Sequence, residues 1–411
     1  SALALTQSNW VKAQLEAAHP GLVVELIGMD TQGDEVHGNR FSTEPLQTLD
    51  GKNFFVKELD EALLAGKTYF SVHSYKDLSL DRPAELVIAA VPTRENPRDV
   101  VLFHPSIREK LMAGGILTLG SASPRRAQNT PEFLQSVLPN VAQHPTEQVR
   151  GGETVEFGAV TAPFKIKMQP LRGNVTTRLR KLEEGRFDGI ILAMAGLNRL
   201  RLDIGQFPKM ILPLDVCPTA PAQGALAIEC RADDTRTRGL LAALNHAPTV
   251  THIAREREVL KRYGGGCHQA FGATSLELAT GRPLSFVRGR SDAGEALDHV
   301  EWEAPQYSGN IIAWDGAAHR QESQTTPLPT PQSPILNAFA THHRAVPEGL
   351  PQPERLWTTG VMSWQKLAGR GYWVEGCAEG LGFAHIAPML EKMGGWTILT
   401  REAAVKGWAQ V

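Results

Sequence analysis

The chain has 411 residues, of which 42% are hydrophobic and 21% are charged, a size and composition that predict about two to four domains with buried cores. Its 42 basic and 44 acidic residues leave a formal net charge of −2. Bulk charge therefore gives no reason to expect a nucleic acid or an anionic membrane as a partner. The longest apolar stretch, 189–197, is far shorter than the ~20 residues of a membrane-spanning helix.

No charged segment followed by an apolar run opens the sequence, so we expect no export signal. We expect residues to be missing before Ser1, because the sequence begins without Met and inside a motif. The four cysteines, Cys217, Cys230, Cys267 and Cys377, form no CxxC pair. This spacing predicts no bound metal and no thioredoxin-type site. So few cysteines favour a reducing compartment, so we expect a cytoplasmic protein rather than a disulfide scaffold.

Helix-like and strand-like segments alternate from the N-terminus onward. The 3.6-residue periodicity of apolar positions predicts helices at 7–18, 54–66, 174–185, 236–245 and 251–263, and another that starts near Pro124. Apolar or alternating runs predict strands at 22–29, 69–74, 85–91, 116–121, 187–195, 225–230, 284–290 and 298–304. This alternation is typical of an α/β fold with parallel sheets covered by helices on both faces.

Two segments interrupt the pattern. Residues 139–168 are rich in Gly, Pro, Gln and Glu without a clear period, which predicts an insertion loop. Residues 316–355 carry seven prolines among Gln, Ser and Thr, a composition typical of an extended linker. The tail at 356–411 contains several tryptophans and a Gly-rich run, so we expect it to form an ordered C-terminal extension.

The segment SVHSYKD at 71–77 places Lys76 and Asp77 where a predicted strand ends. Open α/β sheets bind ligands at the carboxyl ends of their strands. Asp77 is therefore a candidate for a carboxylate held near a substrate. The alternative is a solvated ion pair on a loop.

Basic residues recur where predicted strands end and helices begin. SASPRR at 121–126 joins small residues, a helix N-terminus and the guanidinium groups of Arg125 and Arg126, a combination that suits carboxylate binding. An exposed basic helix start would give the same pattern. Arg172 and Arg178 in LRGNVTTRL, and Arg199 in AGLNRL, occupy similar places. PTAPAQG at 218–224 could be a hinge.

GGGCHQAFG at 264–272 is the sharpest local feature. Three glycines precede Cys267, so the backbone there can approach a ligand closely. The neighbouring His268 could favour the thiolate form of the cysteine. A structural cysteine in a Gly turn is the alternative.

Eleven segments in this order resemble the porphobilinogen deaminase family and cover roughly residues 1–300. They are SALAL (1–5), TQGD (31–34), GKNFFVKEL (51–59), VHSYKD (72–77), RENPRD (94–99), SASPRR (121–126), LRGNVTTRL (171–179), AGLNRL (195–200), AQGALAIECR (222–231), LLAALNH (240–246) and GGGCHQAFG (264–272). The order of so many segments is far more specific than any one of them.

The resemblance implies a hydroxymethylbilane synthase that polymerises four porphobilinogen units on a dipyrromethane cofactor. Cys267 would hold that cofactor through a thioether, and Asp77 would be the catalytic carboxylate. The residues that would bind the cofactor are Lys52, Lys76, Asp77, Ser123, Arg125, Arg126, Arg172 and Gly173. The residues that would bind substrate are Ser1, Phe55, Ser74, Arg178 and Arg199.

The resemblance also implies a fold of two doubly wound domains like those of periplasmic binding proteins, plus a smaller α+β domain and the extension. We expect domain 1 at 1–95 with 220–242, domain 2 at 98–216, and a third domain at 246–312 that carries Cys267. The protein would be a monomer. The tail at 358–383 is faintly similar to part of uroporphyrinogen III synthase, so a contact with that enzyme is a further expectation.

This chain departs from the family pattern in several places: Asn53-Phe54 replaces Gly-Leu, Ala122 replaces a hydroxyl residue and Ala222 replaces Gly. The insertion and the tail have no place in that pattern. Two rival interpretations follow, a binding protein that clamps an anion without chemistry, and a non-catalytic or slow homologue that serves as a tetrapyrrole binder or pathway scaffold. Retained activity after deletion of 316–411 would place catalysis in the first three domains.

Overall fold

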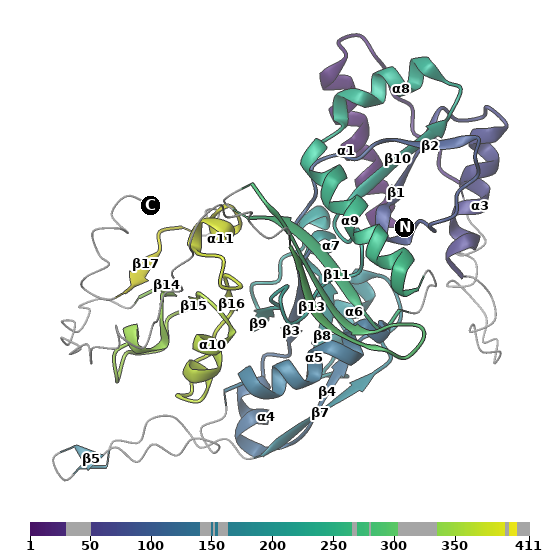
Figure 1. Ribbon diagram of the computed structural model, residues 1–411. Helices are drawn as coiled ribbons and strands as arrows, with labels where there is room; N and C mark the ends of the chain where they lie inside the picture. Colours follow the sequence, from purple (N-terminus) through teal and green to yellow (C-terminus); the bar gives the residue numbers. More distant parts are fainter. Residues whose placement is uncertain are drawn as a thin grey trace, which may run out of the picture.

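The computed structural model describes residues 1–29, 51–139, 163–264, 269–278, 281–302, 335–390 and 394–400, with the backbone of 149–150 and 153–154. Of 51–55 it describes the backbone alone. Figure 1 shows an α/β molecule with two lobes, a third unit against them and a C-terminal unit beside the second lobe. No described helix is both long enough and apolar enough to span a bilayer.

Lobe 1 is built on a three-stranded sheet of order β1-β10-β2. Its elements are α1 (Ala2–Ala18), α3 (Gly51–Leu64), β1 (Phe70–Ser74), the short helix η1 (Tyr75–Asp77), β2 (Leu86–Ala90), β10 (Leu226–Arg231), α8 (Thr235–Leu241) and η3 (Ala242–Leu244). Both neighbours of β10 are antiparallel to it, so β1 and β2 run the same way. The expected parallel sheet is thus divided by a strand that returns from lobe 2.

The strand expected at 22–29 does not form. The segment joins no sheet in the described structure, and only Val24 within it is buried, whereas Val23 is 84% exposed. The Val24 N–H donates to the Glu16 carboxylate instead of to another strand. The apolar pattern was therefore misleading, because a strand also needs a ladder partner.

Lobe 2 holds a five-stranded sheet of order β7-β4-β8-β3-β9. Its elements are β3 (Asp99–Phe103), α4 (Ile107–Ala113), β4 (Gly115–Gly120), α5 (Pro124–Val137), the hairpin strands β5 (Val149–Arg150) and β6 (Glu153–Thr154), β7 (Phe164–Gln169), α6 (Val175–Glu183), β8 (Gly189–Ala193), α7 (Met194–Leu200) and β9 (Lys209–Ile211). Strands β7, β4 and β8 are parallel, and β3 is antiparallel to β8 and β9. The expected insertion loop at 139–168 is wrong at its end, because Phe164 begins β7.

The third unit is an antiparallel sheet with one long helix. Strands β11 (Gly272–Glu277), β12 (Pro283–Arg290) and β13 (Ala296–Trp302) pair in sequence order, and α9 (Ala247–Tyr263) packs against β11. Phe271 and Val287 are buried between helix and sheet. This α+β arrangement matches the expected third domain in type.

The C-terminal unit is a four-stranded parallel sheet of order β16-β15-β14-β17. Its elements are β14 (Asn337–Ala340), η4 (His343–Ala345), β15 (Arg355–Thr358), α10 (Val361–Ala368), β16 (Gly376–Cys377), α11 (Phe383–Leu390) and β17 (Thr397–Leu399). The expected linker at 316–355 is therefore wrong in its second half. The proline-rich stretch contains strand β14, in which Ala338, Phe339 and Ala340 are buried, and Val346 is buried as well.

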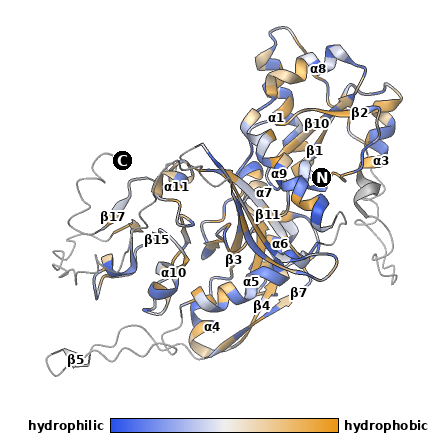
Figure 2. Ribbon diagram, in the orientation of Figure 1, coloured by the Kyte–Doolittle hydropathy of each residue, from blue (hydrophilic) through white to orange (hydrophobic). Residues whose placement is uncertain are grey.

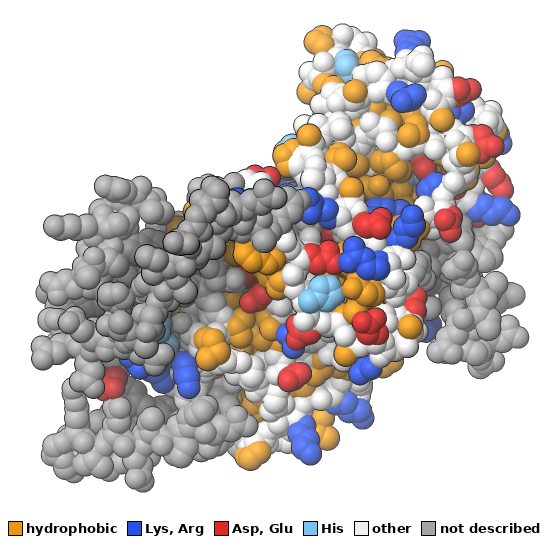
Figure 3. Space-filling view, viewed as in Figure 1, with side chains coloured by type: hydrophobic (Ala, Val, Ile, Leu, Met, Phe, Trp, Pro, Cys, Tyr) orange, Lys and Arg blue, Asp and Glu red, His pale blue; other side chains and the backbone are white. Residues whose placement is uncertain are grey.

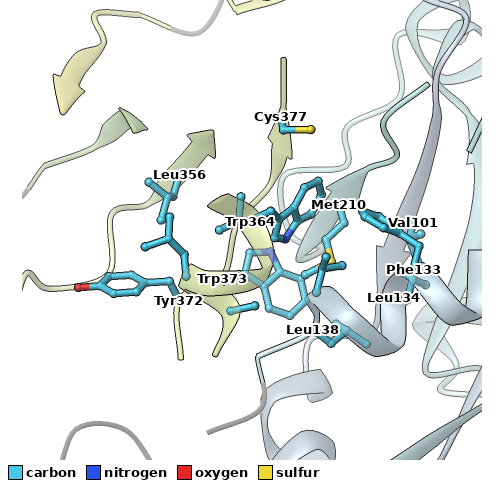
Figure 4. Close-up of a cluster of buried hydrophobic side chains, with 14 of the residues drawn as sticks. Val101, Phe133, Leu134, Leu138, Met210, Leu356, Trp364, Tyr372, Trp373 and Cys377 are labelled. Carbon is cyan, nitrogen blue, oxygen red and sulfur yellow. The ribbon is translucent and has the colours of Figure 1, made fainter. Parts of the chain in front are cut away.

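The core of lobe 2 continues into the C-terminal unit without a break. Trp364, Trp373 and Cys377 share one buried cluster with Phe133 and Met210 of lobe 2 (Figure 4). Phe133 meets Trp364 edge to face, with ring centroids 5.3 Å apart. Figure 2 shows hydrophobic residues along β3, at the centre of this region. Lobe 2 and the C-terminal unit thus stabilise each other through one common core.

Candidate active site

Two segments, 91–98 and 212–225, connect the lobes and lie side by side. The Glu95 N–H donates to the Gly224 carbonyl at 3.1 Å, and Gln223 Nε2 donates to the Pro97 carbonyl at 2.6 Å. A Cβ on Gly224 would stand 2.5 Å from the Glu95 carbonyl oxygen, so this contact requires glycine. We call these two stretches the crossing segments.

Glu256 of α9 accepts hydrogen bonds from both crossing segments near lobe 1. Its carboxylate accepts two hydrogen bonds from the Arg94 guanidinium, at 2.7 and 3.0 Å, and one from the Ala222 N–H at 2.7 Å. The Ser275 N–H donates to the same carboxylate. A single buried side chain therefore holds the third unit to both connections between the lobes.

Asp77 is exposed at the end of η1, directly after β1. Ser74, the last residue of β1, exchanges hydrogen bonds with Gln7 of α1 at 3.0 and 3.2 Å. Burial lowers the pKa of the Lys76 ammonium; Asp77 and Asp99 oppose this shift, and Arg126 and Arg125 reinforce it. Lys76, just after β1 in lobe 1, is therefore within electrostatic reach of Arg125 and Arg126 at the start of α5 in lobe 2.

Asp99 is fully buried, and its carboxylate binds the arginine side chains at the start of α5. It accepts from Arg125 Nη2 at 2.8 Å, from Arg126 Nη2 at 2.7 Å and Nε at 3.1 Å, and from Gln223 Nε2 at 2.8 Å. Burial alone would raise the pKa of Asp99, but the two guanidinium groups hold it well below its usual range. Ser123 caps α5, with its hydroxyl accepting from the Arg126 N–H.

The two arginines are therefore neither an exposed helix start nor an open anion site. Both are buried, and five of their six guanidinium nitrogens donate within the protein: besides the bonds to Asp99, Arg125 Nη1 donates to the Pro218 carbonyl, and Arg126 Nη1 to the Ile191 carbonyl. Arg125 Nε is buried without a hydrogen-bond partner among the described residues. A buried donor of this kind is costly unless a ligand or water meets it.

The other arginines are more open. Arg172 is exposed, and Arg178 is half-buried with Nε donating to the Gly173 carbonyl at 2.7 Å. Gly173 has a φ of 112°, a conformation that glycine adopts without strain. Arg199 is half-buried and donates to the Gly224 carbonyl at 2.7 Å. Burial lowers the pKa of Arg178, and Arg126 lowers it further, so this side chain lies within electrostatic reach of the α5 pair.

Ser1 caps α1, accepting from the Ala4 N–H at 3.3 Å, and is exposed. Helix α1 packs on α7 of lobe 2, where Leu3 lies close to Gly196. Ser1 and Arg199 are thus carried by two helices that meet at the lobe boundary. On the face shown in Figure 3, acidic and basic side chains are interspersed, as the near-zero net charge suggests.

A family model described as porphobilinogen deaminase, dipyrromethane cofactor binding domain, matches residues 1–239, more than half of the 411 residues. The chain belongs to the porphobilinogen deaminase family. The expected membership is confirmed, and with it the broad class of tetrapyrrole-forming transferases.

Solved structures give looser matches. The methionine-binding protein MetQ is 13% identical, with a TM-score of 0.32 over 62% of this chain and 90% of that chain. The periplasmic VFT2 domain of Bordetella pertussis BvgS, as a double mutant, is 16% identical, with a TM-score of 0.28 over 60% of this chain and 82% of that chain. Scores this low carry no inference, so the α/β assignment rests on the sheets described above.

Three residues that the family resemblance singles out lie outside what the structure describes. Cys267 is outside the described residues, as are the side chains of Lys52 and Phe55, whose backbone belongs to α3. The described flanks of the cysteine segment are close together, since Gln269 Nε2 donates to the Gly264 carbonyl at 3.4 Å. A Cβ on Gly272, at the start of β11, would stand 3.0 Å from Arg125 Cδ. The described residues that follow Cys267 therefore reach Arg125 of α5 at Gly272.

Sequence reasoning missed Asp99, Gln223, Gln7 and Glu256. Asp99 and Gln223 lie inside RENPRD and AQGALAIECR, but these motifs did not by themselves indicate a role for either residue. Their partners are far away in sequence, and only the fold brings them together. Among the described residues no group of three or more His, Cys, Asp or Glu side chains could hold a metal ion.

Proposed function

We propose that this protein is a hydroxymethylbilane synthase, which deaminates four porphobilinogen molecules and joins them into a linear tetrapyrrole. The observation that carries the proposal is the exposed Asp77 beside half-buried Lys76, where Lys76 lies within electrostatic reach of the arginine pair of lobe 2. Family membership supports the same reaction class. We also propose a cytoplasmic monomer; the free, buried thiols of Cys217, Cys230 and Cys377 suit a reducing compartment.

Asp77 would act on the cationic parts of the reaction. Porphobilinogen loses ammonia during coupling, which leaves positive charge on the pyrrole. A carboxylate next to the reacting ring can assist departure of the amine and stabilise that charge. Lys76, adjacent in η1, would bind a substrate carboxylate and keep it oriented toward Asp77.

Each porphobilinogen unit brings two carboxylates, so a growing chain needs several cations. Arg172 before α6, Arg178 in α6 and Arg199 in α7 are more open than the α5 pair, and we propose that they bind these groups together with Ser1 and Ser74. Arg125 and Arg126 are paired with Asp99, and within the described structure Arg125 Nε is a buried nitrogen without a hydrogen-bond partner. We propose that this pair mainly fixes the geometry around one ligand carboxylate.

The described residues fit a dipyrromethane cofactor, because its carboxylates need cations and Arg125 Nε is a buried donor without a partner. We propose that Cys267 holds the cofactor by a thioether, while Lys52, Ser123, Gly173 and Phe55 line its site. When bound, this group supplies the nucleophilic pyrrole to which new units are added. The protein's part is to hold its carboxylates and exclude water.

Intact-protein mass spectrometry tests the cofactor. The purified protein is expected to carry the added mass of two pyrrole units, and Cys267→Ala is expected to lack it, because no thiol remains to form the thioether. Cys230→Ala, which removes a buried thiol of lobe 1, serves as the matched control and should keep the adduct. An unmodified parent protein would favour a binding protein or scaffold without chemistry.

Asp77→Asn tests the catalytic carboxylate. We expect turnover of porphobilinogen to fall by about 100-fold or more, because the amide can neither assist proton transfer nor balance positive charge. The melting temperature should stay near that of the parent, since Asp77 is exposed. Asp81→Asn, a change of another exposed carboxylate on the following loop, is the control and should retain activity. Near-normal turnover in Asp77→Asn would rule out this role.

A further inference from the structure

The C-terminal unit reaches the crossing segments through one carboxylate. Glu379 follows β16 and is buried. Its Oε1 accepts from Arg98 Nε at 2.8 Å and from the Leu214 N–H at 3.2 Å, and its Oε2 accepts from Arg98 Nη2 at 2.6 Å. Arg98 belongs to the first crossing segment and Leu214 to the second. One side chain of the C-terminal unit therefore joins both.

Neighbouring groups reinforce this contact. His385 of α11 lies 2.9 Å from Arg98 Nη2 and 3.2 Å from the Glu379 carboxylate. Asn96 of the first crossing segment donates to the Met389 sulfur at 2.9 Å. Burial would raise the pKa of Glu379, but Arg98 and His385 lower it to about 2, so the carboxylate stays ionised near neutral pH.

The unit that supplies Glu379 is itself firmly attached. The Ile211 N–H of β9 donates to the Glu375 carbonyl at 2.7 Å, and Trp373 Nε1 donates to the Lys209 carbonyl at 3.0 Å. Leu381 packs with Leu214 and with Phe286 of the third unit. In Figure 1 α11 lies beside the junction of lobe 2 with the third unit. A support fixed in this way can restrain the segments that it holds.

We propose that the C-terminal unit braces the connection between the lobes, with Glu379 as the residue that restrains both crossing segments at their lobe 2 ends. Glu256 does the same near lobe 1, so the two segments are held at both ends. Connections between domains are where relative motion is absorbed. Holding them limits how far the lobes can move apart. This proposal concerns motion alone and does not depend on the proposed reaction.

Hydrogen–deuterium exchange of the full chain tests the brace with Glu379→Gln. The amides of 94–98 and 212–217 are expected to exchange at least about tenfold faster, because Arg98 and the Leu214 N–H lose their charged acceptor. Amides of β1 and β10 in lobe 1 should exchange as in the parent. Small-angle scattering should show a larger radius of gyration for the variant, as the lobes separate more freely.

Glu375→Gln is the matched control. Glu375 is also a buried carboxylate of the C-terminal unit, but its ion pairs are with Arg355 and Lys209 and leave the crossing segments untouched. We expect parental exchange in both crossing segments. Equal acceleration in the two variants would show general loosening of the unit and overturn the brace.

A double variant covers the case in which Glu379→Gln does not fold, since it leaves the Arg98 charge buried and unpaired. Arg98→Met with Glu379→Met removes the ion pair in one step, and apolar replacement of a buried pair is often tolerated. The folded double variant should again show faster exchange in 94–98 and 212–217 and a larger radius of gyration. Parental values for both quantities would refute the proposal.

Discussion

Buried charge at the lobe connections is the dominant feature at the scale of single residues. Asp99, Glu256 and Glu379 are buried. Each forms an ion pair with an arginine from a different segment of the fold. Such pairs give little net stability but cost several kcal/mol when one partner is removed. They therefore specify how the units fit together more than they add to the free energy of folding.

Asp215 is an exception, because no arginine hydrogen-bonds to it among the described residues. Its Oδ1 is buried without a partner, and burial followed by repulsion from Glu379 raises its pKa to about 6. A raised folded-state pKa means that the folded protein binds the proton more tightly than the unfolded chain. The contribution of Asp215 to the free energy of unfolding is thus most favourable below pH 4 and is lost as the pH rises from about 4 to 6.

We expect Asp215→Asn to increase the free energy of unfolding by about 2 kcal/mol at pH 7.5 and to leave it nearly unchanged at pH 4, because the amide carries no charge to desolvate. Urea unfolding of both proteins at the two pH values measures this difference. Asp233→Asn, which changes an exposed carboxylate, should leave the pH dependence of the free energy of unfolding as in the parent protein. The same increase at both pH values would argue against a titration of Asp215.

At the scale of elements, local sequence signals were reliable where a segment's own pattern decides its structure. The start of α5 could be predicted because Pro124 suits a first-turn position, and Pro124 takes that place directly after the cap residue Ser123. Asp77 and Lys76 could likewise be located at the end of a strand. Short strands in unusual surroundings could not be predicted. Strand β14, for example, lies within a proline-rich stretch whose composition predicts a linker.

Pairing across the chain was the part that sequence could not supply. The segment at 22–29 has the composition of a strand but pairs with no other described strand, whereas β3 begins with a charged residue, Asp99, and is buried throughout. From sequence, Arg125 and Arg126 were predicted to bind an anion in an open site. In the structure both donate to Asp99, which lies more than twenty residues earlier in the chain. In each case the deciding partner is distant in sequence, so only tertiary structure identifies it.

At the scale of the whole molecule, lobe 2 and the C-terminal unit form a single body. Two buried clusters run across their boundary, and they include Ala338, Phe339, Trp357 and Trp364 from the C-terminal side. The deletion of 316–411 that sequence analysis suggested as a functional test would therefore expose the core of lobe 2.

A chain that ends at residue 334 is accordingly expected to be insoluble or unfolded, since removing even one large buried aromatic side chain costs about 3–5 kcal/mol. Circular dichroism and size-exclusion chromatography of the truncated protein measure this. Gln365→Ala, which removes a surface hydrogen bond between α10 and Ser136, should remain folded and serves as the comparison. A soluble, cooperatively unfolding truncation would show that the common core is dispensable.

Strand β17 pairs with β14 inside the C-terminal sheet and contains residues near the end of the described chain, Thr397–Leu399. During synthesis on the ribosome, the second edge of β14 stays uncovered until β17 has been translated. Lobe 2, although translated much earlier, keeps an apolar face uncovered until then. Nascent chains stalled late in translation should therefore recruit chaperones to lobe 2, well after lobe 1 has been made.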